Sequence, residues 1–288
     1  MKQMTSIEKA VNRLVGKPGA EGTLASSKLP GDAAEAFSSH SDASAEQKKL
    51  VKLDRPLMAA NSLLLPEMGS SPLADQFRRI KQPLLRRLDS QSGSNALSNV
   101  VMVTSSLEGE GKTYTSINLA ISIAMELDRT ALLVDLDVVK KSVVSQLGIA
   151  VDPGLSDYLI NREVEIANII HSTDIDRFKL IPAGNAKQIE ANAELLTSEK
   201  MKAFLLELST RYKDRVIVLD TPPLLASSIA KGLAFMAGHL VMVVEAEKTS
   251  STIISESLQY LDGSRFAGFV LNKTNLASSK DSVYGSYG

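Results

Sequence analysis

After the polar segment DSQSGSNALS, short apolar runs alternate with stretches of helical periodicity. The apolar runs, rich in β-branched and aliphatic residues, are NVVMVT, TALLVDLD, RFKLIPAG, RVIVLD, HLVMVVEA and FAGFVLNK. Between several of them lie amphipathic stretches such as AELLTSEKMKAFLLELSTRY and STIISESLQYL. Nearly continuous apolar strands that alternate with helices predict an α/β fold, in which a mostly parallel sheet carries helices on both faces.

The beginning of the chain has a different pattern. Ile7, Val11 and Leu14 form the apolar stripe of a short predicted helix. From residue 17 to about residue 48 the chain is rich in Gly, Ala, Ser and Asp and has almost no large apolar residue, which is typical of a linker. We expect this N-terminal extension to lack a core of its own.

The segment SPLADQFRRIKQPLLRRL predicts a further helix, with Leu73, Phe77 and Ile80 on one face. Pro83 is expected to end or kink this helix. We therefore divide the chain into an N-terminal extension over residues 1–70, a domain over residues 71–276 and a C-terminal tail over residues 277–288.

Composition excludes several classes of protein. At 288 residues and 44% hydrophobic, the chain can bury one large α/β core, and its net charge of −1 argues against broad binding to nucleic acid. It has no cysteine, and its histidines are isolated, so thiol chemistry and a histidine-clustered metal site are not expected. No apolar run approaches the ~20 residues of a membrane span, and the start lacks the apolar region of a signal peptide. We expect a cytoplasmic protein.

The segment SSLEGEGKT lies between a predicted strand and a predicted helix. Gly109 and Gly111 allow backbone N–H groups to approach phosphate oxygens, Lys112 supplies a charge to the β- and γ-phosphates, and Thr113 is placed to ligate Mg²⁺. Ser106 stands where the strict phosphate-loop pattern has its first glycine, and serine is small enough for that turn. The candidate nucleotide contacts of this loop are Ser106, Glu108, Gly109, Glu110, Gly111, Lys112, Thr113 and Tyr114.

Three aspartates follow apolar strands. Asp135 and Asp137 lie on the same side of an extended strand near its carboxyl end, where ligands bind in open α/β sheets. Asp220 closes RVIVLD as a Walker B aspartate does, so that it would reach Mg²⁺ directly or through water. The candidate catalytic residues are therefore Lys112, Asp135, Asp137 and Asp220, and the candidate metal ligands are Thr113, Asp137 and Asp220.

Together these motifs resemble those of the bacterial tyrosine kinases over about residues 72–288. SSLEGEGKT corresponds to their Walker A motif, LLVDLDVVKK to a second Walker A-like motif and VIVLDTPP to Walker B, and DPGLSDYL and IPAG…AELL are also similar. SIEKAVNRL near the start resembles the exosortase-associated branch tied to exopolysaccharide export. The resemblance implies a P-loop NTPase fold of the MinD/ParA type.

The resemblance further implies ATP- and Mg²⁺-dependent autophosphorylation, in trans, within a ring of identical subunits. It implies an activator, a membrane protein of the type that regulates polysaccharide chain length, which would recruit the chain to the inner face of the cell membrane. Tyr284 and Tyr287 are the implied phosphate acceptors. Asp135 is the first candidate for accepting the tyrosine proton, and Asp220 is the second.

The resemblance also assigns residues outside the central motifs. Asp75, Arg78 and Lys81 correspond to the E-x-x-R-x-x-R oligomerisation motif, and Asn272 is similar to an asparagine that faces adenine in related ATPases. The chain departs from the family at Val139-Lys140-Lys141, where arginine and often proline are usual, and at Ile229, where an acidic residue is usual.

Two alternatives from other functional classes stay open. A MinD/ParA-like switch ATPase would carry a lysine at the position of Leu107, so this residue weakens that reading. A nucleotide-binding scaffold of an export complex, without kinase activity, is suggested by Ile229.

Overall fold

The computed structural model describes residues 50–93, 96–138, 140, 142–185, 193–211, 214–263 and 265–274. The predicted helix near residues 6–14, the linker that follows it and the tail tyrosines Tyr284 and Tyr287 lie outside the described residues.

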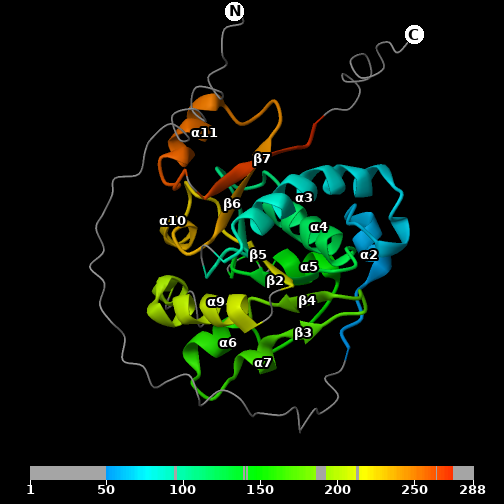
Figure 1. Ribbon diagram of the computed structural model, residues 1–288, viewed down its shortest axis with the longest axis vertical. Helices are drawn as coiled ribbons and strands as arrows, with labels where there is room; N and C mark the ends of the chain where they lie inside the picture. The colour runs from blue at the N-terminus through cyan, green and yellow to red at the C-terminus, as the bar shows by residue number, and fades with distance from the viewer. Residues whose placement is uncertain are drawn as a thin grey trace, which may run out of the picture.

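A seven-stranded sheet forms the centre of the described chain, in the order β3-β4-β2-β5-β1-β6-β7 (Figure 1). Its strands are β1 (Val100–Ser105), β2 (Thr130–Asp135), β3 (His171–Ser172), β4 (Phe178–Ile181), β5 (Arg215–Asp220), β6 (His239–Glu245) and β7 (Phe266–Asn272). Neighbouring strands are parallel except for β3 and β4. Each of the six predicted apolar runs forms a strand, and the mostly parallel sheet is confirmed. The two-residue β3 is too short to leave a pattern in the sequence.

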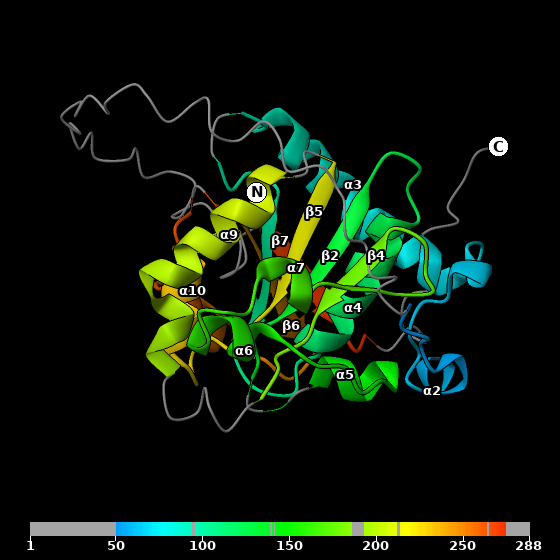
Figure 2. The same ribbon diagram turned by 90° about the horizontal axis from the view of Figure 1, so that it is seen from below.

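Helices cover both faces of this sheet (Figure 2). One face carries α2 (Arg55–Ala60), α3 (Pro72–Ser90), α4 (Lys112–Ala124) and α5 (Ser142–Leu147). The other face carries α6 (Leu155–Ile160), α7 (Ile166–Ile169), α9 (Glu199–Arg211), α10 (Ser228–Ala234) and α11 (Ser251–Leu258). Two short 3₁₀ helices, η1 (Pro66–Met68) and η2 (Ala193–Thr197), complete the described elements.

The period of two along each strand divides the core into two halves. Val100 and Met102 of β1 pack in the core half beneath α9 and α10, whereas Val101 and Val103 pack in the half beneath α3 and α4. All four side chains are fully buried. Because successive side chains of a strand point to opposite faces, a strand covered on both sides must be apolar throughout. This constraint explains the continuous apolar runs of the sequence.

Helix α3 continues through Pro83 to Ser90, so the prediction that the helix ends at Pro83 is wrong. Pro83 lies on the exposed side of the helix. Phe77, Leu84 and Leu88 are buried on the opposite side, against the core half that contains α4. This apolar packing offsets the hydrogen bond that proline removes from the helix. Among the described residues, no helix combines the length and the apolar character that crossing a membrane requires.

The folded unit begins before the predicted boundary at residue 71. Leu53, Met58, Leu63 and Leu64 are buried in the same core half as α4, and the backbone N–H of Leu64 donates to Asn118 Oδ1 at 2.5 Å. The segment around Val51 also pairs with the edge of the sheet through its bridge to Thr173. The described residues before α3 thus complete the core of the domain.

We predict that Leu64→Ala lowers the free energy of unfolding by about 2–4 kcal/mol, since it leaves a cavity in a closely packed core. Leu50→Ala is the matched control, because Leu50 is 52% exposed and its truncation is expected to cost less than ~0.5 kcal/mol. Urea denaturation of both variants measures the difference. Equal stabilities would show that residues 50–64 are not part of the domain core.

Candidate active site

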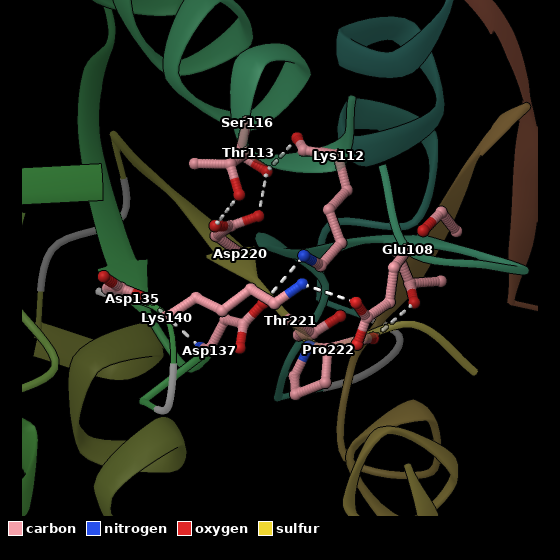
Figure 3. A network of polar contacts seen from close by, with 12 residues as sticks. Glu108, Lys112, Thr113, Ser116, Asp135, Asp137, Lys140, Asp220, Thr221 and Pro222 are labelled. Carbon is pink, nitrogen blue, oxygen red and sulfur yellow. Dashed lines mark hydrogen bonds and ion pairs between the residues drawn. The ribbon is translucent and has the colours of Figure 1, made fainter. Parts of the chain in front are cut away.

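The predicted catalytic residues meet at the carboxyl edge of the sheet (Figure 3). The phosphate loop, residues 106–111, joins β1 to α4, and Lys112 is the first residue of that helix. Asp135 ends β2 and lies opposite Asp220, which ends the neighbouring strand β5. Parallel pairing therefore brings together two carboxylates that are 85 positions apart in the sequence.

The two loop glycines have left-handed backbone conformations. Gly109 has φ +82° and Gly111 has φ +95°, a region that side chains with a Cβ rarely occupy. A Cβ on Gly111 would lie 2.0 Å from Asn272 Nδ2, so the loop backbone needs glycine for close packing as well. Ser106, at the position of the missing glycine, is fully buried, and its Oγ has no hydrogen-bond partner among the described residues.

Lys112 forms a buried ion pair across the site. Its Nζ lies 2.7 Å from Asp137 Oδ2, and both side chains are less than a tenth exposed. Lys112 therefore connects the loop to the segment after β2. Bound phosphate oxygens would compete with Asp137 for its ammonium group.

Asp220 binds the first turn of α4. Its two carboxylate oxygens accept hydrogen bonds from Thr113 Oγ1 at 2.7 Å and from Ser116 Oγ at 3.0 Å. Sequence analysis identified Thr113 and Asp220 but missed Ser116. The available signal was its spacing, because a residue three positions after Thr113 lies on the same side of a helix.

The three aspartates have strongly perturbed surroundings. Burial, and then repulsion from Asp220 and Asp137, raises the pKa of Asp135 well above its ordinary value. Burial raises the pKa of Asp220 to about 6, against the opposing effects of Lys112, Thr113 and Ser116. Asp135 Oδ1 accepts the N–H of Asp137 at 3.1 Å, while its Oδ2 is buried without a hydrogen-bond partner. Three acids at this edge thus carry more negative potential than Lys112 alone can balance.

This donor set fits a divalent cation bound together with phosphate. Mg²⁺ prefers oxygen ligands, and in phosphate-binding sites it is usually bound through one or two carboxylates together with phosphate and water. Over the ranges that the structure describes, no group of three or more acidic or histidine side chains forms a metal site by itself. Thr113, Asp220 and Asp137 are the residues that would hold the ion.

Lys140 reaches the phosphate loop from the segment after β2. Its Nζ lies 2.7 Å from Glu108 Oε2, and this contact lowers the pKa of Glu108. Both side chains are exposed, so the pair is weak and readily exchanged. Lys140 thus places a second cation at the mouth of the site, where the related kinases usually have arginine.

Two predicted nucleotide contacts have other partners in the structure. Asn272 Nδ2 donates to Glu110 O at 2.9 Å, so its side chain is bound to the loop backbone. The Tyr114 ring meets Phe77 of α3 edge to face, and burial raises the pKa of its hydroxyl. Ile229, which replaces the usual acid, packs against the core.

The predicted oligomerisation residues on α3 divide into two groups. Asp75 and Arg78 are exposed and form an ion pair with each other. Lys81 is buried, and its Nζ donates to Ser122 O at 2.6 Å and pairs with Glu126 Oε1 at 2.5 Å. Its ammonium is thus bound inside the subunit, between α3 and the end of α4, and its assignment to a subunit interface stays a prediction.

Comparison with known proteins identifies the family. Residues 98–264 match the AAA domain family. The tyrosine-protein kinase CpsD of Streptococcus agalactiae is 30% identical over 193 residues, which cover 66% of this chain and 81% of CpsD. This chain belongs to the bacterial tyrosine-protein kinases. The resemblance of its sequence motifs is thereby confirmed, and the MinD/ParA-like alternative is not favoured.

Two further tyrosine kinases match this chain over part of their length or of its own. The tyrosine-protein kinase wzc of Salmonella typhimurium is 33% identical over 195 residues, which are 67% of this chain but 26% of wzc. The chain thus spans about a quarter of that relative's length. The kinase domain of the Escherichia coli tyrosine kinase ETK has a TM-score of 0.56 at 27% identity, covering 66% of this chain and 72% of that domain. The P-loop fold implies nucleotide binding.

The pKa of Asp220 predicts how stability depends on pH. Its folded value of about 6 lies above the ordinary 3.8, so the folded state holds more protons than the unfolded state between these values. This contribution to stability is complete below the unfolded pKa and is lost as pH rises through about 6. We expect Asp220→Asn to raise the free energy of unfolding at pH 7.5 by ~1–2 kcal/mol. Its melting temperature should then exceed that of the native chain by about 2–6 °C.

Thermal melts of the ligand-free protein between pH 5.5 and 7.5 measure this effect. The Asp220→Asn variant should lose part of the decline in melting temperature that the native chain shows as pH rises. Asp176→Asn is the control, because the Asp176 side chain is 91% exposed. If Asp220→Asn and the control follow the native curve, Asp220 is not the titrating group.

Proposed function

We propose that this chain is an ATP-dependent protein-tyrosine kinase that phosphorylates Tyr284 and Tyr287 of its own C-terminal segment in trans, and that it regulates exopolysaccharide synthesis or export. The observation that carries the proposal is the joint placement of Lys112, Thr113, Asp220 and Asp135 at one sheet edge. Membership of the tyrosine-kinase family supports the choice of acceptor.

Binding of the phosphates follows from the loop. The left-handed glycines allow backbone N–H groups to surround phosphate oxygens, and the start of α4 adds a favourable dipole. Lys112 is drawn from Asp137 to the β- and γ-phosphates. Thr113, Asp220 and Asp137 would hold Mg²⁺, which would supply positive charge to offset that of the phosphate oxygens.

The transfer step joins the tyrosine oxygen to the γ-phosphorus and breaks the bond from that phosphorus to the bridging oxygen, releasing ADP. The phenolic proton passes to a carboxylate, for which Asp135 is the better placed group. Its Oδ2 has no hydrogen-bond partner among the described residues, whereas both oxygens of Asp220 already accept hydrogen bonds from hydroxyl groups. A raised pKa also makes the Asp135 carboxylate a stronger base once it is ionised.

Assembly is the second part of the proposal. The subunits form a ring through the exposed face of α3, which includes Asp75 and Arg78, and a membrane protein that regulates polysaccharide chain length activates the ring and brings it to the inner face of the membrane. The proposal is supported by exposure of this ion pair, which leaves both side chains accessible to a neighbouring subunit.

Phosphopeptide mass spectrometry after incubation with ATP and Mg²⁺ tests the enzymatic proposal. We expect phosphate on Tyr284 or Tyr287 in the native chain and none in Lys112→Met, because the variant lacks the cation that binds the phosphates. Tyr284→Phe/Tyr287→Phe should abolish the signal while leaving nucleotide binding intact. ATP hydrolysis without phosphotyrosine would favour the switch ATPase, and nucleotide binding with neither product would favour the scaffold.

The ring proposal has its own test. Arg78→Glu reverses one charge on the exposed side of α3 without touching the buried Lys81, and it should shift the native oligomer toward monomer in light-scattering chromatography. Lys202→Glu on α9 is the matched control, since Lys202 is also half exposed but lies over the other face of the sheet. If the two variants behave alike, α3 does not form the interface.

A further inference from the structure

The phosphate loop contains a carboxylate that the transfer chemistry does not use. Glu110 lies between the two loop glycines, and only 2% of its surface is exposed. A buried carboxylate is stable only when hydrogen bonds replace its lost hydration. The identity of those donors shows what Glu110 holds in place.

The Glu110 side chain connects the loop to two other segments. Its Oε2 accepts the N–H of Leu107, at the start of the loop, at 2.6 Å. Its Oε1 accepts the N–H of Glu245, the last residue of β6, at 3.3 Å, and the hydroxyl of Thr249 in the turn before α11. Charge-assisted bonds of this kind are the strong ones. One side chain thus fixes both the shape of the loop and its position over β6.

The loop backbone is held from β7 as well. Asn272 Nδ2 donates to Glu110 O at 2.9 Å, and Lys273 Nζ donates to Gly109 O at 2.8 Å. Lys273 also pairs with Glu245 Oε2 at 3.1 Å, which joins the ends of β6 and β7. Glu110 therefore belongs to a continuous polar network on the β6–β7 side of the loop.

Sheet order separates this network from the transfer site. β1, which leads into the loop, lies between β5 on one side and β6 on the other. The acids that would act next to the γ-phosphate, Asp135 and Asp220, end strands on the β5 side. A nucleoside triphosphate whose γ-phosphate lay at these acids would have the ends of β6 and β7, where Glu110 fixes the loop, on the opposite side of β1.

We propose that Glu110 is a positioning residue for nucleotide binding, which sets the affinity for ATP and ADP rather than the rate of phosphoryl transfer. The inference rests on the proposed function only in that a nucleoside triphosphate binds the loop. Without the carboxylate, the free loop loses its ordered shape, and each binding event must order it again. The free-energy cost of this ordering raises the dissociation constant. The β5 side, which holds the transfer groups, keeps its contacts.

Fluorescence titration with N-methylanthraniloyl-ADP tests the inference on the full chain. Glu110→Ala should raise the dissociation constant about tenfold, equivalent to ~1.4 kcal/mol. Glu110→Gln keeps one acceptor oxygen and should raise the dissociation constant by only about threefold. This smaller effect reflects the retained hydrogen bond and not only the retained side-chain volume. Glu247→Ala is the control, because Glu247 is an exposed residue of the same β6–α11 turn, and its affinity should match that of the native chain.

The rate of phosphorylation at saturating ATP is the second readout, and we expect it to stay within about threefold of the native rate in Glu110→Ala. A native-like dissociation constant in folded Glu110→Ala, or a loss of saturating rate as large as the loss of affinity, would overturn the inference. If Glu110→Ala does not fold, Thr249→Val removes one hydroxyl donor only, and its dissociation constant should rise by about twofold. If the native chain forms no phosphotyrosine, the proposed function fails, and the ADP titration still decides the role of Glu110.

Discussion

The hydrogen bonds from Thr113 and Ser116 to Asp220 set the geometry of the whole site. They fix the first turn of α4 against the end of β5. The phosphate loop leads directly into this turn of α4. Parallel pairing then places Asp135 beside Asp220. Because the contact is fully buried, the loop, the helix and the acidic strand ends share one rigid arrangement.

The cost of this arrangement is visible in the charges. Three aspartates lie close to one another at the sheet edge, and burial and mutual repulsion raise the pKa of Asp135 and Asp220. Such a group destabilises the ligand-free fold at neutral pH. The strands β1, β2 and β5 are buried on both faces, and their apolar packing supplies the stability that offsets this repulsion. A cation bound as proposed would reduce this repulsion.

The sequence predicted the sheet and the acidic strand ends well, because both follow from local patterns. Apolar runs identify the strands, and Asp135, Asp137 and Asp220 follow them directly. Ser116, Lys81 and Glu110 could not be assigned in the same way. Their roles depend on which distant atoms they meet, such as Ser122 O for Lys81 and the N–H of Glu245 for Glu110. The early start of the fold was missed for a similar reason: Leu53 and Met58 are buried only because the domain core receives them. The tail acceptors, Tyr284 and Tyr287, remain a prediction.

The described chain enters and leaves the sheet at opposite edges. Val51 bridges to Thr173 beside β3, which is one edge, and β7, which is the other, ends at Asn272. Six strand spacings of ~4.8 Å separate these edges by roughly 29 Å. The first and last described residues, Leu50 and Thr274, therefore lie near opposite edges of the sheet.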